Sequence, residues 1–173
     1  QRAVRLLKPL SERVSWDSNG HVREIALVGE NVHDEHVAAL GDLKQLEALS
    51  LHSWSISDDC MRDVMKLPNL TALDIQFTLI SDAGCRHLAG CPALRLIVID
   101  GTPITDEGLT HLARIPTLCQ VFAEQTKITK EGIANFVDRR DDRSIQFDSS
   151  YRNSSRDDPG KSAAERSTES ALR

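Results

Sequence analysis

The sequence predicts an α/β solenoid, an array of short strands that alternate with short helices. One observation is a pattern of apolar residues that returns every 24 residues between residues 22 and 141. A second is that each copy changes from the alternating spacing of a strand to the spacing of a helix. The third is composition, because 40% apolar residues and a mean hydropathy of −0.32 in 173 residues are typical of one globular domain.

Each unit opens with a strand pattern. The five units begin at Val22, Leu46, Leu70, Leu94 and Leu118. Their fourth and sixth places are apolar, as at Leu73 and Ile75, so one side of each strand is expected to be buried. A proline at the twenty-third place of the three middle units ends the helix and resets the chain for the next strand.

A helix start follows in each unit. Hydroxyl residues that can serve as N-caps stand at the twelfth place of four units: Ser57, Ser81, Thr105 and Thr129. Acidic residues come directly after the cap in most units, where we expect them to face the positive end of the helix dipole. The sixteenth and nineteenth places are apolar and three residues apart, which predicts that each helix buries one face.

The repeat resembles the leucine-rich repeat family. Its pattern is Leu-x-x-Leu-x-Leu-x-x-Thr-x-Ile-Thr/Ser-Asp-x-Gly-Leu, most complete at residues 94–109. Thr78, Thr102 and Thr126 stand where many family members have Asn or Cys, which is similar to the Thr-containing variety of bacterial, planctomycete-like proteins. The resemblance implies a short right-handed horseshoe with a parallel sheet on its concave face and helices on its convex face.

We expect four segments along the chain. Residues 1–21 should form a capping helix and the first strand of a hairpin, which turns at Asn19-Gly20. The repeats occupy 22–141, a partial capping strand 142–148, and a disordered tail rich in Ser, Arg and Asp 149–173. The first ten residues are similar to the segment that follows an N-terminal membrane anchor in such bacterial proteins, which implies an anchor before Gln1.

The strand places that point away from the helices supply the candidate binding residues. These are the third, fifth and seventh places of each unit, on the concave face that the resemblance implies. We hypothesise that a partner contacts Asp74, Gln76, Leu96, Val98, Asp100, Phe122 and Glu124. Asp100 and Glu124 would lie side by side and repel one another, and a basic partner would relieve the repulsion. The alternative is a solvated acidic face that binds nothing.

A second candidate patch lies where strands lead into loops, and it comprises Trp54, Phe77 and Leu79. Trp54 replaces threonine at the ninth place of its unit, and tryptophan is common at binding hot spots. The alternative is that Trp54 packs over Phe77 and replaces the missing threonine contact.

The function that fits best is a non-catalytic module that binds a protein or peptide, with a basic segment favoured, and acts as a monomer. One alternative is the substrate-recognition part of a larger assembly, as in ubiquitin-ligase adaptors, although no F-box-like segment precedes Val22. An enzyme that uses the acidic residues ranks third, because acid–base catalysis needs a partly desolvated pocket.

Other classes of ligand are not expected. A net charge of −5 without a basic stripe argues against nucleic acid, and we expect no membrane contact by the repeats themselves. The four cysteines lack the spacing of a zinc site, and His33 and His36 have no third ligand at a suitable distance in the sequence. We therefore expect neither a metal nor a cofactor.

Overall fold

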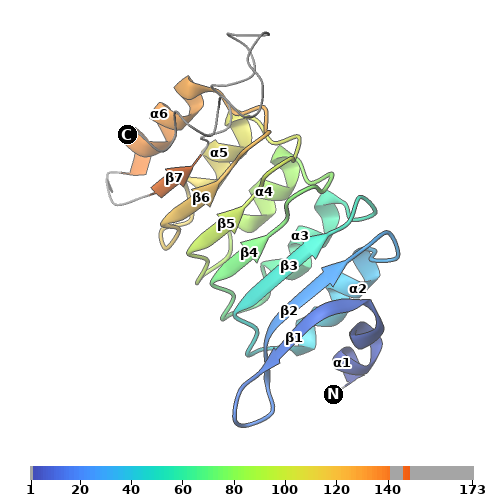
Figure 1. The fold of residues 1–173 in the computed structure, drawn as a ribbon. Helices are drawn as coiled ribbons and strands as arrows, with labels where there is room; N and C mark the ends of the chain where they lie inside the picture. The colour runs from blue at the N-terminus through green and yellow to red at the C-terminus, as the bar shows by residue number, and fades with distance from the viewer. Residues whose placement is uncertain (1, 141–145, 149–173) are drawn as a thin grey trace, which may run out of the picture.

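A seven-stranded sheet runs along the whole array (Figure 1), in the computed structural model that describes residues 2–140 and 146–148. The strands are β1 (Ser11–Trp16), β2 (Val22–Val28), β3 (Ala48–His52), β4 (Ala72–Asp74), β5 (Leu96–Val98), β6 (Gln120–Phe122) and β7 (Gln146–Asp148). They lie in chain order. β1 is antiparallel to β2, and all later neighbours are parallel.

One helix precedes β1, and from β2 to β6 a helix follows each strand. The helices are α1 (Arg2–Leu7), α2 (Asp34–Ala39), α3 (Met61–Val64), α4 (Asp82–Leu88), α5 (Asp106–Leu112) and α6 (Lys130–Arg140), with 3₁₀ turns η1 (Lys8–Leu10), η2 (Leu40–Asp42) and η3 (Asp58–Cys60). None of the helices between residues 2 and 140 has the length and apolar character needed to cross a bilayer. The tail expected at 149–173 and the start of the capping strand, 142–145, lie outside the described residues.

The strand register places equivalent residues of successive units side by side. Along the fifth place, Ser50 pairs with Asp74, Asp74 with Val98, and Val98 with Phe122. Partners from β2 to β6 are therefore 24 residues apart, as the sequence period requires. The fold is an α/β solenoid with a parallel sheet, as predicted.

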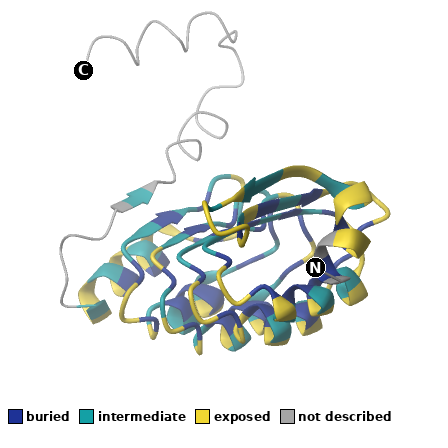
Figure 2. Cartoon of the chain, turned by 90° about the horizontal axis from the view of Figure 1, so that it is seen from below, coloured by how far each residue is buried: buried dark blue, intermediate teal, exposed yellow. Residues whose placement is uncertain are grey.

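The core lies between the sheet and the helices (Figure 2), where strand residues such as Leu73 meet helix residues such as Leu88. Three of the four cysteines, Cys60, Cys85 and Cys91, are buried free thiols and pack in this core as small apolar residues. Burial raises the pKa of the Cys91 thiol to about 12, so it stays protonated and unreactive.

One contact joins each helix start to the unit before it. The carboxylate of Asp58 accepts hydrogen bonds from Ser81 N (2.7 Å), Ser81 Oγ (2.6 Å) and Gly84 N (3.0 Å). Ser81 Oγ in turn accepts from Ala83 N as a conventional N-cap (3.3 Å). Asp58 therefore satisfies N–H groups at the start of the next helix, in addition to lying in the first turn of its own.

The same contact recurs along the helix layer, and we call it the aspartate ladder. It joins Asp34 to Ser57, Asp58 to Ser81, Asp82 to Thr105 and Asp106 to Thr129. These aspartates lie at the helix starts, as predicted, and their bonds to the next unit were not predicted. At α2, the helix of the first unit, His33 N donates instead to His36 Nδ1 within the same helix start, at 3.0 Å.

The ladder also explains the glycine at the fifteenth place of the last three units. A Cβ atom on Gly108 would lie 2.5 Å from Asp82 Oδ1 and 2.6 Å from Ile104 Cγ2. Both distances are shorter than any normal contact, so only glycine lets the carboxylate reach the helix N–H group. Gly84 and Gly132 show the same close approach to Asp58 and Asp106.

We predict that Asp58→Ala lowers the free energy of unfolding by about 2 to 3 kcal/mol, because it removes hydrogen bonds from two backbone N–H groups and one hydroxyl. Urea unfolding of the purified chain measures this. Asp59→Ala is the matched control, since Asp59 is the next residue but makes only an exposed ion pair with Arg62 (3.3 Å). Equal losses in the two variants would contradict the ladder.

We also predict that Gly108→Ala destabilises the protein by about 1 to 3 kcal/mol, although alanine is the better helix former, because its methyl group would displace Asp82. Gly41→Ala serves as the control, because a Cβ at Gly41 meets nothing within 4 Å. That change should leave stability unchanged or raise it by about 0.5 kcal/mol. Thermal unfolding of both variants against the parent chain distinguishes the two effects.

Candidate interaction surface

The sheet face opposite the helices, called the open face from here on, presents the third, fifth and seventh places of each unit. All seven residues proposed there from the sequence are partly exposed: Asp74, Gln76, Leu96, Val98, Asp100, Phe122 and Glu124. Leu96 and Val98 lie two residues apart on β5, and Val98 pairs with Phe122 on β6. The structure therefore brings three apolar side chains together, with Asp74 on the neighbouring strand β4.

The open face is acidic. Its third, fifth and seventh places in the five units carry the carboxylates Glu24, Asp74, Asp100 and Glu124 but no lysine or arginine. A hollow of about 520 Å³ extends this face over β1 to β3, between Glu12, Glu24 and His52. Arg13 also lines the hollow and is the one basic residue with a permanent charge among its lining residues. Carboxylates outnumber basic residues on the open face, so a cationic group is the complementary ligand.

Asp100 has a structural role that sequence analysis did not foresee. Its Oδ1 accepts a hydrogen bond from Glu124 N at 2.6 Å, across the neighbouring strand. The Asp100 carboxylate therefore extends the pairing of two units of the sheet. A charge-reversing substitution at Asp100 would disturb this bond as well as the surface charge.

A side-chain bridge joins units two and three on the open face. His52 Nε2 lies 2.9 Å from Asp74 Oδ2 and 3.2 Å from Gln76 Nε2. Gln76 N donates to Asp74 Oδ1 at 3.1 Å. The hydrogen bond and the charge of Asp74 raise the pKa of His52 above its ordinary value of 6.5, against the opposing effect of burial, with a smaller contribution from Glu12.

The bridge was not predicted, although a signal for it exists in the sequence. His52 occupies the seventh place of its unit and Asp74 the fifth place of the next, which are diagonal neighbours across two paired strands.

Ser50, His52 and Asp74 are the residue types of a hydrolase triad, but their arrangement is different. A triad needs the carboxylate on one ring nitrogen of histidine and the serine on the other. Ser50 and His52 both lie in the described part of the chain, and no hydrogen bond joins them there. Residues 2–140 and 146–148 also contain no group of three His, Cys, Asp or Glu side chains placed to hold a metal ion.

The second predicted patch is exposed at the carboxyl ends of β3 and β4. Trp54 is 63% exposed, Phe77 45% and Leu79 55%. The alternative that Trp54 packs over Phe77 is wrong, because the described residues show no ring contact between them and the Phe77 ring instead lies over Gly101. We call these three side chains the rim cluster.

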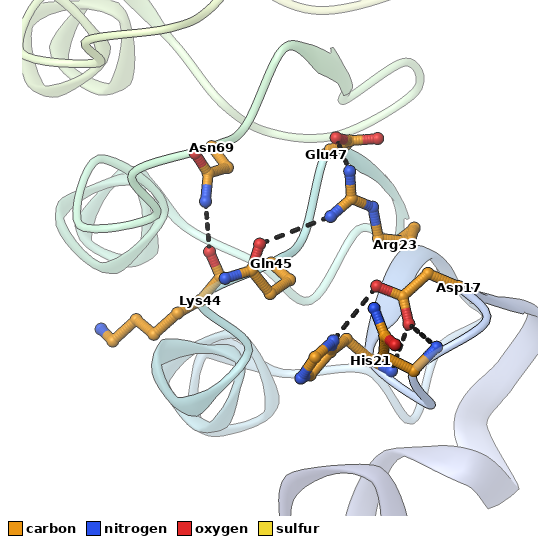
Figure 3. A network of polar contacts seen from close by, with 8 residues as sticks. Asp17, His21, Arg23, Lys44, Gln45, Glu47 and Asn69 are labelled. Carbon is orange, nitrogen blue, oxygen red and sulfur yellow. Dashed lines mark hydrogen bonds and ion pairs between the residues drawn. The ribbon is translucent and has the colours of Figure 1, made fainter.

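The opposite edge of the sheet is closed by polar contacts (Figure 3). Arg23 forms an ion pair with Glu47 and reaches Gln45 Oε1 at 3.4 Å, and Asn69 Nδ2 donates to Lys44 O at 2.8 Å. These contacts join residues of the first two units. The edge also carries the half-exposed Trp16, which pairs with Val22, whereas the carboxyl ends of β3 and β4 carry the three exposed apolar side chains of the rim cluster.

We predict that the NMR titration of His52 gives a pKa above 6.5, and that Asp74→Asn returns it toward 6.5 while Glu12→Gln changes it less. Because the pKa is raised in the folded state, the bridge contributes stability below pH 6.5 that is lost as pH rises through the raised pKa. We expect about 0.5 to 1 kcal/mol for this partly exposed pair. An unchanged His52 titration in Asp74→Asn would contradict the bridge.

Comparison with known proteins supports the fold. No protein-family model and no curated protein sequence matches the chain. Among solved structures, an internalin (inlF) of Listeria monocytogenes is similar with 19% identity and a TM-score of 0.50, over 79% of this chain and 45% of the internalin. The Arabidopsis receptor kinase HAESA is similar over 79% of this chain and 27% of its own, with 16% identity and a TM-score of 0.46. PEPR1, solved with AtPEP1, is similar over 78% and 23%, with 15% identity and a TM-score of 0.44. The chain thus spans less than half of each of these proteins, and the likeness to the internalin supports a leucine-rich-repeat solenoid.

Proposed function

We propose that the chain is a non-catalytic protein-interaction module that binds a basic segment of a protein or peptide across its open face. The observation that carries the proposal is the charge of that face, which has four carboxylates and no lysine or arginine at its third, fifth and seventh places. The whole chain contains 21 lysine and arginine residues, so their absence from these places of the five units is a local feature rather than a property of the composition.

The apolar centre of the face supports a binding role as well. Leu96, Val98 and Phe122 lie together on β5 and β6, and Asp100 and Glu124 follow them at the ends of the same strands. An interface commonly combines an apolar centre with a polar rim, and aromatic residues are enriched in its centre. A segment that places its aliphatic stems over Val98 and its cations near Asp100 and Glu124 would match this arrangement.

The geometry of the face also argues against an acid–base role for its carboxylates. Asp74 is bound to His52 and Gln76, and Asp100 accepts a backbone N–H from Glu124. These groups are fixed by neighbouring strands of the sheet. A preformed row of fixed charges favours the recognition of a complementary chain, because little side-chain ordering remains to be done on binding.

The test removes the charges and keeps one acceptor oxygen at each place, although asparagine at residue 74 replaces one of the two oxygens that bind His52 and Gln76. A displayed library of random short peptides is first selected against the immobilised chain, and the proposal expects enrichment of lysine and arginine. The triple variant Asp74→Asn, Asp100→Asn, Glu124→Gln keeps oxygen acceptors at all three places. We predict that it weakens binding of the enriched peptide about tenfold at low salt, measured by calorimetry, and that the difference shrinks as salt is added.

A matched control changes the net charge equally on the helix side. Asp59→Asn, Glu107→Gln and Glu131→Gln alter three exposed carboxylates that lie at helix starts and not on the open face. This control should bind the peptide as the parent chain does. Equal weakening in both triple variants would indicate a nonspecific effect of net charge and would contradict the proposal, as would a selection that enriches no basic peptide.

A further inference from the structure

The exposed apolar side chains of this protein gather at one edge. Seven large apolar residues of the described chain are exposed, and four of them lie at the carboxyl ends of consecutive strands: Val28, Trp54, Phe77 and Leu79. The equivalent loop places in units four and five carry Gly101 and Pro103, or Gln125 and Lys127. The solenoid therefore does not require large apolar groups at these loop places.

Trp54 is exposed because the preceding residue, Ser53, supplies the buried hydroxyl of this loop. In unit three the buried Thr78 hydroxyl, at the ninth place, donates to Ile75 O at 2.7 Å. In unit two the hydroxyl comes one residue earlier, since the buried Ser53 donates to Val32 O at 2.9 Å and accepts from Ser55 N at 3.1 Å. The Ser53 hydroxyl thus makes the hydrogen bonds of this loop without Trp54, whose side chain is exposed to solvent.

Phe77 is held in a backbone conformation that is unfavourable for a bulky residue. Its φ is +53°, in the left-handed region. The same place holds glycine in units one and four, with φ of +110° at Gly29 and +65° at Gly101, and Gln125 with φ of +55° in unit five. A non-glycine residue in this region costs about 1 to 2 kcal/mol. The Phe77 ring packs against Gly101 of the next unit and still leaves 45% of the residue exposed, which offers a large apolar surface to a partner.

The rim cluster adjoins the acidic open face at a break in the sheet. At the eighth place, Gly29 N donates to His52 O, Phe77 N to Asp100 O and Gly101 N to Glu124 O, at 2.8 to 3.0 Å. Within the described residues, Ser53 N makes no corresponding hydrogen bond to Gln76 O. The His52–Asp74–Gln76 bridge joins the two units here instead, and Phe77 follows Gln76 directly in sequence while Trp54 stands two residues after His52.

We infer that the rim cluster binds a large apolar side chain of the same basic segment that the open face is proposed to bind. The inference rests on the proposed function, because the adjoining carboxylates specify the charge of the occupant. The partner is thus an extended segment in which an aromatic or large aliphatic residue lies near lysine or arginine. The rim supplies an apolar anchor, and the open face supplies the complementary charge.

The test uses the full chain and the displayed library of random short peptides. The chain holds two tryptophans, so Trp16→Phe leaves Trp54 as the single indole, and its emission reports directly on the rim. We expect the enriched peptides to combine basic residues with a large apolar residue and to shift Trp54 emission to shorter wavelength. Replacing that apolar residue by serine should weaken binding about tenfold.

Variants of the protein separate the rim from the open face. Trp54→Ser with Phe77→Asn should remove the tenfold preference for the apolar peptide and leave the serine peptide bound as before, since asparagine tolerates the left-handed conformation. Leu6→Ser is the matched control, because Leu6 is 53% exposed on α1 at the end of the array, and it should retain the preference.

Each other outcome overturns the inference in a distinguishable way. Basic peptides that lack an apolar residue and leave Trp54 emission unchanged would overturn it while the proposed function stands. A preference that persists in the Trp54→Ser, Phe77→Asn variant would place the anchor elsewhere. A dimer of the chain that this variant dissociates, seen by analytical ultracentrifugation, would mean that a second copy covers the rim. Enrichment of no basic peptide would overturn the proposed function itself.

Discussion

The architecture depends on the carboxylate that each unit gives to the helix start of the next. Helices of seven residues, such as α4 and α5, are too short to be stable alone. Their first N–H groups have no partner inside the helix, and a buried unpaired group is costly. An aspartate from the preceding unit satisfies them and at the same time keeps the helix layer in step with the strands. The open face is therefore a rigid surface with fixed spacing, because both layers of the solenoid are joined at every unit.

Much of this fold follows from the sequence, because its period appears in the residues themselves. The strand places, the N-caps and the alignment of Asp74, Val98 and Phe122 all result from a register of 24 residues. The direction of the aspartate bond did not follow, since Asp58 stands next to its own helix and its partner is 23 residues away. The glycine at the fifteenth place was the available signal. It makes sense only when the carboxylate of another unit approaches it.

The candidate surface could be predicted in outline and not in detail. Residues at equal places form rows, so the acidic and apolar members of the open face were expected together. The orientation of Trp54 depends on which residue of the loop supplies the buried hydroxyl. In this unit Ser53 at the eighth place supplies it, and the repeat spacing, which has threonine at the ninth place, gives no sign of that shift. The bridge between His52 and Asp74 depends on side-chain reach across a diagonal. Such contacts are decided by packing, which the pattern of residue types does not record.

The aspartate ladder also bears on how arrays of this kind can grow and diverge. Serine and threonine present the same hydroxyl to the carboxylate, and Asp34, Asp58, Asp82 and Asp106 present the same carboxylate to it. The joint between two units is chemically uniform, whereas the side chains on the open face differ from one unit to the next. An interior unit can therefore be duplicated, removed or exchanged in register without new chemistry at the junction. Every junction between units uses the same aspartate–hydroxyl contact, whereas the open-face side chains differ between units. The binding properties of the surface can therefore change while the contact that joins the units stays the same.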